Sequence, residues 1–219
     1  MAPPTPYYGS GKFSESSSLT WDIRWSVRTL TSKRRMIVHA SAVLVPVLAE
    51  ATSSNLVLVL LALVTVGYIL SELLRLRGVR LPLISAFTLK MIRGQESVGF
   101  VSRPVYLALG VILVLLLFPK TIAYASIAIV GIGDPVAAYV GGRFGRRRIG
   151  RKSLEGFMAG SIAAFIGTLI VVAPITGAIG SIAGMLIELV GIWDDNFTVP
   201  LAAGIAMIGA NSFLRLIVA

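Results

Sequence analysis

Apolar residues dominate seven stretches of this chain, and short polar or charged segments separate each stretch from the next. A helix that crosses a membrane needs about 20 mainly apolar residues, and somewhat fewer where flanking side chains reach the interface. The pattern therefore predicts an all-α, polytopic membrane protein with about seven transmembrane helices. The expected helices lie near residues 36–51, 54–74, 103–118, 121–142, 154–174, 177–192 and 198–218.

A polar segment and an amphipathic segment precede the first apolar stretch. Residues 1–17 are rich in Ser and Pro and lack the apolar core of a signal peptide, so we expect a flexible N-terminus. Apolar side chains recur at helical spacing in Ser18–Arg35, which predicts an amphipathic helix on the membrane surface. Pro82–Arg93 has the pattern of a second interfacial helix. No long repeat or Pro-rich linker divides the chain, and residues 18–219 are expected to form a single integral membrane domain.

The distribution of charged residues predicts how the helices are oriented across the membrane. Charged residues make up 14% of the chain, against about 25% in an average soluble domain. The net charge is +10, and basic residues gather in three groups of six, before the first stretch, at 75–103 and at 143–152. The positive-inside rule then places the N-terminus and the even-numbered connections in the cytoplasm. This clustering favours membrane topology and the binding of anionic groups over nucleic-acid binding.

Ten acidic residues accompany these cations, and most lie near the cytoplasmic ends of the expected spans. Carboxylates are ligands for Mg²⁺, while Arg and Lys bind phosphate oxygens, so the two together suit a metal–nucleotide complex. Glu188 lies about one turn inside the membrane, where ionisable groups are costly and usually functional. The alternative is that the acids only set topology and cap helices. For Glu155 this alternative has a concrete form. Glu155 falls in the first turn of a helix that Ser153 or Lys152 can cap, where the helix dipole favours an acid.

Familiar motifs of soluble enzymes do not fit this chain. Gly145–Ser153 reads GRRRIGRKS, with one Arg too many between the last Gly and the Lys for a P-loop, and no strand precedes it. The absence of cysteine excludes disulfides and thiolate metal sites. His39 is the only histidine, which argues against a Ser–His pair or a multi-histidine metal site, and we expect it to be packed and hydrogen-bonded.

Glycines suggest two further features. The GGRFG segment at 141–145 can turn tightly and let backbone N–H groups approach an anion. The small-residue patterns at Gly156–Gly160 and Gly180–Gly184 predict close packing between helices.

The segment GDPVAAYVGGRFGR, from Gly133, is followed by GRKSLEG from Gly150. Together they resemble the signature of the CTP-dependent polyprenol and lipid kinases. That family includes dolichol kinase, phytol and farnesol kinases and the eukaryotic CTP-dependent diacylglycerol kinase, and it is related to phosphatidate cytidylyltransferases. SELLR at 71–75, Glu96, and DDNFTVP at 194–200, which is similar to the family's D-N-x-x-x-P element, extend the resemblance over about residues 33–218. The chain departs from the pattern at Pro135, where the family commonly has Ala or another small residue.

The resemblance implies phosphoryl transfer from CTP to the hydroxyl of a membrane lipid alcohol, in one catalytic domain whose active site faces the cytoplasm. Asp134 is then expected to bind Mg²⁺ or to help activate the hydroxyl, and Lys152 and Arg143 to hold phosphates. CTP, the lipid alcohol and membrane lipids are the implied partners, and nucleic acid is not among them. The implied residues are catalytic Asp134, Lys152 and Glu155; nucleotide- and phosphate-binding Gly141, Gly142, Arg143, Lys152, Ser153 and Asn196; metal-binding Asp134, Asp194 and Asp195; and supporting Glu72, Arg75, Glu96 and His39.

Two other functions stay open from the residues alone. A cytidylyltransferase, which joins CMP to a lipid phosphate and releases pyrophosphate, would use the same residue types. A small transporter or lipid-flipping protein would have acids throughout the depth of the membrane and an inverted repeat, whereas the acids here gather on one side. The sequence identifies neither the lipid alcohol nor the oligomeric state, and the choice of CTP over ATP rests on the resemblance alone.

Overall fold

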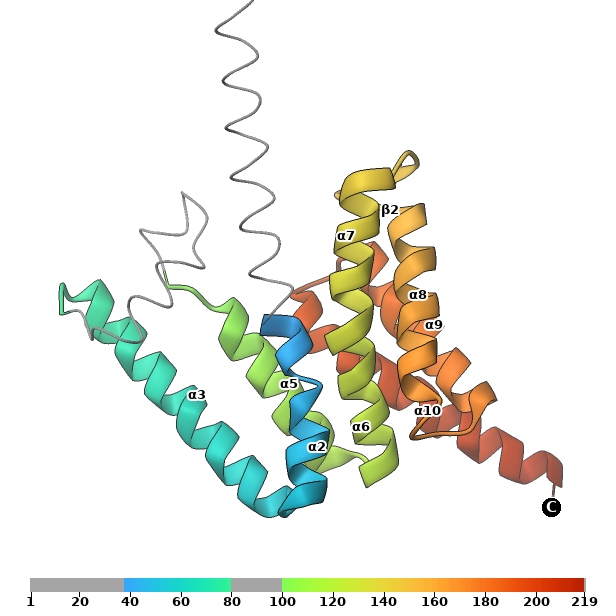
Figure 1. The fold of residues 1–219 in the computed structure, drawn as a ribbon, viewed down its shortest axis with the longest axis horizontal. Helices are drawn as coiled ribbons and strands as arrows, with labels where there is room; N and C mark the ends of the chain where they lie inside the picture. Colours follow the sequence, from blue (N-terminus) through green and yellow to red (C-terminus); the bar gives the residue numbers. More distant parts are fainter. Residues whose placement is uncertain (1–37, 80–99, 219) are drawn as a thin grey trace, which may run out of the picture.

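The computed structural model describes residues 38–79 and 100–218. Most of these residues are helical, which confirms the prediction of an all-α protein (Figure 1). The expected flexible segment 1–17, the amphipathic helices at Ser18–Arg35 and Pro82–Arg93, and Glu96 lie outside the described residues.

Helices occupy all seven apolar stretches. Three of the elements, α6, η2 and α7, form one continuous helix, Lys120–Phe144, in which η2 is a π-helical turn. The elements are α2 (Leu44–Ala51), α3 (Ser54–Leu76), α5 (Arg103–Leu117), α6 (Lys120–Ala128), η2 (Ile129–Gly133), α7 (Asp134–Phe144), β1 (Arg148–Ile149), β2 (Lys152–Ser153), α8 (Leu154–Thr168), α9 (Pro174–Val190) and α10 (Asp195–Val218).

Within residues 38–79 and 100–218, three helices are long and apolar enough to cross a membrane, namely Ser54–Leu76, Lys120–Phe144 and Asp195–Ile217. Four apolar helices are shorter, at 10–17 residues: Val38–Ala51, Arg103–Leu117, Leu154–Thr168 and Pro174–Val190. The 15 residues of α5 extend about 22 Å, while the hydrocarbon core of a bilayer is about 30 Å thick. Length and composition therefore support a membrane protein, and the number of seven spans stays a prediction.

Local sequence signals set several helix ends. Ser53 caps α3 and Ser153 caps α8, where the serine oxygen accepts a hydrogen bond from the Gly156 N–H at 3.1 Å. Of the two caps predicted for α8, Ser153 is the one that forms. Gly191 ends α9 at φ 65°, a left-handed conformation that a residue without Cβ adopts readily.

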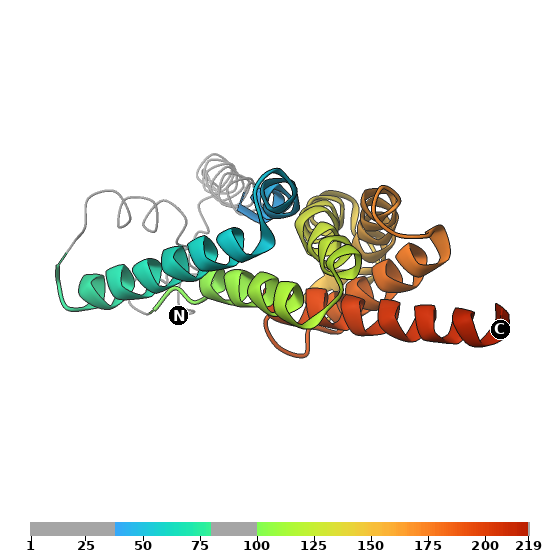
Figure 2. The same ribbon diagram turned by 90° about the horizontal axis from the view of Figure 1, so that it is seen from below.

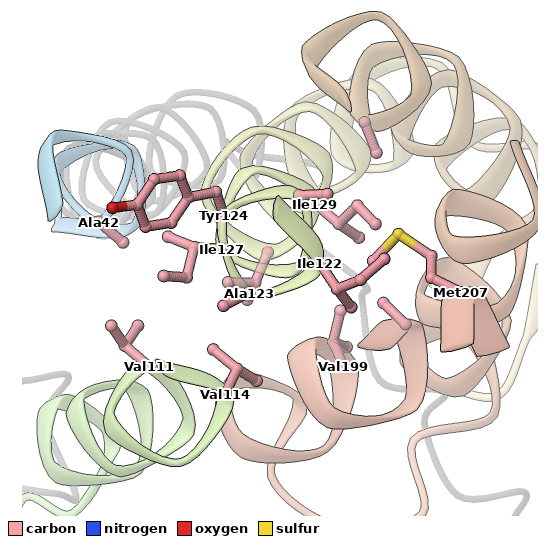
Figure 3. Close-up of a cluster of buried hydrophobic side chains, with 14 of the residues drawn as sticks. Ala42, Val111, Val114, Ile122, Ala123, Tyr124, Ile127, Ile129, Val199 and Met207 are labelled. Atoms are coloured by element: carbon pink, nitrogen blue, oxygen red, sulfur yellow. The ribbon is translucent and has the colours of Figure 1, made fainter. Parts of the chain in front are cut away.

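The helix Lys120–Phe144 is the centre of the bundle. In its most apolar 18-residue segment, 78% is buried, whereas 22% of the corresponding segment of α3 is buried. Ile127 and Ile129 on this helix share one buried cluster with Val111 of α5 and with Met207 of α10 (Figure 3). Lipid tails are as apolar as these side chains, so in a bilayer the cluster stabilises the fold chiefly through close packing.

Small residues let the helices around this centre approach closely. A Cβ on Gly156 would lie 2.7 Å from the Ala137 carbonyl oxygen, and a Cβ on Gly160 would lie 2.7 Å from the Ala137 Cβ. A Cβ on Gly180 would lie 2.5 Å from Met207 Cγ in α10. The close packing predicted for the two small-residue patterns is confirmed.

The two ends of the bundle carry different groups. At one end, an ion pair of 2.8 Å joins Lys120 Nζ at the start of α6 to Glu50 Oε1 at the end of α2. At the other end, the basic segment 143–152 begins in the last turn of α7 and runs through β1 into the start of β2 (Figure 1). The helix α3 packs on α5 and α2 along one flank, and the C-terminal part of α10 extends beyond the other helices (Figure 2).

Candidate active site

One lysine lies among three carboxylates at the hairpin end of the bundle. Lys152 Nζ is 2.6 Å from Glu188 Oε1, 2.8 Å from Asp195 Oδ2 and 3.9 Å from Asp134 Oδ1. The four residues come from β2, α9, α10 and α7, so the tertiary fold brings them together. Asp134 and Glu188 are each only 2% exposed. These four residues are called the Lys152 cluster below.

A π-helical turn precedes Asp134 in the central helix. Pro135 has no N–H to donate to the Gly131 carbonyl, and its ring would crowd that carbonyl in a regular α-helix. The wider turn of η2 lies at this place, and the helix continues through Pro135 to Phe144. The departure from the family pattern at Pro135 therefore does not break the helix.

Gly131 lets a second element approach Asp134. A Cβ on Gly131 would lie 2.7 Å from Val43 Cγ2 and 3.2 Å from the His39 carbonyl oxygen. The close approach brings the His39 ring to the site, where its Nδ1 lies 2.8 Å from Asp134 Oδ2. His39 is buried, as predicted, and it contacts a member of the Lys152 cluster.

The hairpin carries Lys152 toward the cluster. Arg148 pairs with Ser153 and Ile149 with Lys152, and Gly150 adopts φ 58° in the turn between the strands. The turn is short, so the position of Lys152 follows directly from the pairing of the two strands.

The carboxylates keep Lys152 charged. Burial lowers the pKa of Lys152, but the negative charges of Glu188, Asp134 and Asp195 outweigh this effect and raise that pKa above its ordinary value. Lys152 is therefore a positive charge throughout the physiological pH range, and it offsets part of the repulsion among the three acids.

Glu155 lies beside the hairpin rather than in the cluster. Its Oε1 accepts a hydrogen bond from the Arg147 backbone N–H at 3.0 Å, and the residue does not line the cavity that adjoins the cluster. The contacts of Glu155 thus hold the stem of the hairpin, at a position for which the sequence predicts a catalytic role.

An open cavity of about 1390 Å³ adjoins the Lys152 cluster and is lined by all four of its residues. Arginines from α5, α7 and the hairpin also line it, and guanidinium groups bind phosphate oxygens well. The cavity is therefore suited to a polyanion such as a nucleoside triphosphate. The lining arginines are Arg103, Arg143, Arg148 and Arg151, and all six residues predicted to bind nucleotide and phosphate also line the cavity: Gly141, Gly142, Arg143, Lys152, Ser153 and Asn196.

The start of α10 divides its polar residues between different roles. Asp194 Oδ1 accepts a hydrogen bond from the Asn196 backbone N–H at 3.0 Å and so caps the helix, while Asp195 belongs to the Lys152 cluster. Asn196 is buried, and its Nδ2 donates to the Arg103 carbonyl oxygen at 3.4 Å. Its Oδ1 has no hydrogen-bond partner among the described residues, so it can accept one from a ligand or water.

Pro200 accounts for another part of the DDNFTVP motif. Proline has no N–H to donate to the Asn196 carbonyl four residues earlier. A Cβ on Gly110 of α5 would lie 2.6 Å from that carbonyl oxygen, so α5 and α10 meet closely at this point.

Glu72 and Arg75 pair with each other on α3 and do not line the cavity. Arg75 Nη2 donates to Glu72 Oε1 at 2.7 Å, and its Nε donates to Glu72 Oε2 at 2.9 Å. The Val101 N–H also donates to Glu72 Oε1, at 2.9 Å. These contacts tie α3 to the segment before α5, so the described part of the chain does not bring this pair to the predicted pocket.

Three acids of the cluster are placed to hold a metal ion. One carboxylate oxygen from each of Asp134, Glu188 and Asp195 lies within 4.8 Å of the others, and such oxygens suit Mg²⁺. Glu188 Oε2 is buried and has no hydrogen-bond partner among the described residues, so it is available to a cation. The predicted metal set has Asp194 in the place of Glu188. The sequence marks Glu188 as a lone acid in an apolar helix, but it does not give its partners.

Comparisons of the chain with protein-family models, with curated proteins and with solved structures find no match.

Proposed function

We propose that this protein is an integral membrane kinase that transfers the γ-phosphate of CTP to the hydroxyl of a lipid alcohol. The observation that carries the proposal is the Lys152 cluster, with one ammonium among three carboxylates in a cavity lined by arginines. Phosphoryl transfer needs positioned charges of both signs more than it needs a nucleophilic side chain. CTP as the donor rests on the resemblance of segment 133–156 to the CTP-dependent lipid kinases.

Mg²⁺ is the proposed cofactor, and Asp134, Glu188 and Asp195 are the residues that would hold it. Bound there, it would neutralise charge on the phosphate oxygens of the nucleotide. The oxygen donors of the three acids support this choice of ion, since Mg²⁺ favours carboxylates together with substrate phosphates.

In the proposed reaction, the lipid hydroxyl oxygen forms a bond to the γ-phosphorus of CTP. The bond between that phosphorus and the β–γ bridging oxygen breaks, so the products are a lipid phosphate and CDP. The hydroxyl proton passes to a carboxylate oxygen of Asp134. Lys152 and Arg143 hold phosphate oxygens and stabilise the charge that moves to the leaving group.

The seven apolar helices are proposed to cross or enter the membrane, with the N-terminus and the active site on the cytoplasmic side. The six basic residues of segment 143–152 lie at the same end of the bundle as the Lys152 cluster. The Glu50–Lys120 ion pair lies at the opposite end. Enrichment of Lys and Arg on the cytoplasmic side supports this orientation, and CTP reaches a site that opens there.

Transfer of label from CTP tests the proposal. Purified protein with Mg²⁺ is given a panel of lipid alcohols and lipid phosphates, with CTP labelled at the γ- or the α-phosphate. Label from the γ-position in the lipid establishes a kinase and identifies its acceptor, whereas label from the α-position establishes a cytidylyltransferase. No transfer by intact protein from CTP or ATP would reject both enzymes and favour a transporter.

A further inference from the structure

Trp193 lies at the edge of the cavity, in the connection between α9 and α10. It lines the cavity, yet 62% of the residue is exposed, so part of the indole is open to a ligand. Two residues further along the chain, Asp195 Oδ2 contacts Lys152 Nζ at 2.8 Å. The exposed ring is thus carried by the same short segment as a member of the Lys152 cluster.

Two aromatic neighbours orient Trp193 without stacking on it. The Tyr106 ring lies 5.8 Å away between centroids at an interplanar angle of 57°, and the Phe197 ring lies 5.4 Å away at 72°. Tilted and edge-on contacts of this kind are favourable and hold a ring in a defined plane. In the described part of the chain, neither of the two rings that contact Trp193 lies parallel to it.

We propose that Trp193 is the stacking platform for the base of the nucleotide, whose phosphates extend toward Lys152 and the arginines of the cavity. The inference rests on the proposed function and names how that site recognises its nucleotide. Every base has a π face, so stacking provides affinity that a bare polyphosphate cannot gain. The exposed ring and the basic side chains of the cavity would then bind the two chemically different ends of one ligand.

The competing explanation is that Trp193 only anchors the bundle at the membrane surface, where Trp is enriched. Loss of a membrane anchor would not change the affinity for a nucleotide more than the affinity for a polyphosphate without a base. The next residue, Ile192, provides a matched control, because it is 70% exposed and apolar but does not line the cavity.

CTP and inorganic tripolyphosphate separate the two explanations, since both carry a triphosphate and only CTP has a base. Their affinities for the purified full chain in lipid nanodiscs, with Mg²⁺, are measured by isothermal titration calorimetry. We expect Trp193→Ala to weaken CTP binding about ten-fold and Trp193→Phe to weaken it less. Both variants should bind tripolyphosphate as the wild type does, and Ile192→Ala should bind both ligands as the wild type does.

Equal CTP affinity in the wild type and in Trp193→Ala would overturn the stacking platform and leave the proposed kinase intact. A parallel loss of CTP and tripolyphosphate binding would also overturn it, because the ring would then act through the fold. Failure of the wild type to bind either ligand would instead count against the proposed function itself, and the platform would be rejected with it.

Discussion

His39 Nδ1 lies 2.8 Å from Asp134 Oδ2, and both residues are almost completely buried. The other carboxylate oxygen of Asp134, Oδ1, is the one nearer to Lys152, at 3.9 Å from its Nζ. A side chain from the first apolar stretch thus lies against one oxygen, while the second oxygen faces the candidate active site. A close neighbour on the outer oxygen of a carboxylate helps to fix its orientation toward a metal or a hydroxyl.

This contact predicts that substitutions of His39 depend on where they place a nitrogen. The amide nitrogen of His39→Asn can occupy the position of Nδ1, whereas that of His39→Gln can occupy the position of Nε2. We expect His39→Asn to retain most of the transfer rate and His39→Gln to lose about 10–100-fold. Transfer assays are combined with Mn²⁺ affinity from electron paramagnetic resonance. Equal rates and affinities in the two variants would show that Nδ1 has no positioning role.

Removal of either charge at the centre of the site should abolish most of the activity. We expect Asp134→Asn and Lys152→Ala each to slow transfer by roughly 10²–10³-fold while the chain still folds, since each removes a group that acts on the reacting phosphate or hydroxyl. Label transfer and thermal unfolding are measured on the same samples. Wild-type turnover by either variant would refute the role given to that residue.

Arg147→Ala is the matched control for Lys152→Ala. Arg147 contributes its backbone N–H to Glu155, which the substitution preserves, and it does not line the cavity. We expect its transfer rate to fall by no more than about two-fold, the scale of a small change in a screened surface charge. A loss as deep as that of Lys152→Ala would mean that the phosphates bind elsewhere along the basic segment.

Glu188 and Asp194 offer a direct test of the metal ligands. Glu188→Gln keeps the size of the side chain but removes a charge from the three-carboxylate group, so we expect Mn²⁺ affinity to fall at least about ten-fold. Asp194→Asn keeps an oxygen that can cap α10, so we expect nearly unchanged affinity. Titration of both variants with Mn²⁺ shows whether Glu188 or Asp194 is the metal ligand. The reverse order of effects would favour Asp194 as the ligand.

Glu155 should tolerate loss of its charge but not loss of its hydrogen bond. Glu155→Gln can still accept the hydrogen bond from the Arg147 N–H, whereas Glu155→Ala cannot. We expect the Gln variant to keep most of the transfer rate and the Ala variant to lose several-fold, through a loosened hairpin. Loss of transfer activity in Glu155→Gln would instead indicate that Glu155 acts as a catalytic acid or base.

The length of the apolar stretches is enough to predict the helices, because each expected stretch is continuous and bounded by charged or turn-forming residues. The motif around Asp134 and Lys152 also predicts the centre of the site. Its residues are local features of one helix–hairpin–helix segment, and four of its glycines line the cavity together with Ser153: Gly141, Gly142, Gly150 and Gly156. Membrane crossing is harder to predict, since four of the apolar helices are shorter than a bilayer is thick.

The remaining differences between the sequence predictions and the structure concern which of several acids lie close together. Glu72 has Arg75 three residues later, and this local pair satisfies it without the pocket. Asp194 and Asp195 are adjacent, but one caps α10 and the other reaches Lys152. Glu188 meets Lys152 across 36 residues of sequence. Such a contact depends on how α9 packs against the hairpin, and a single sequence does not contain that information.

The position of Lys152 also bears on how the site is assembled in a membrane. Three carboxylates brought together in a bilayer without a cation would repel one another and carry a large desolvation penalty. Because the chain supplies its own counter-ion, the bundle can form before any metal or nucleotide arrives. Removal of divalent ions would then abolish the activity of the proposed enzyme without unfolding it. Inactivation by a chelator is therefore expected to be reversible.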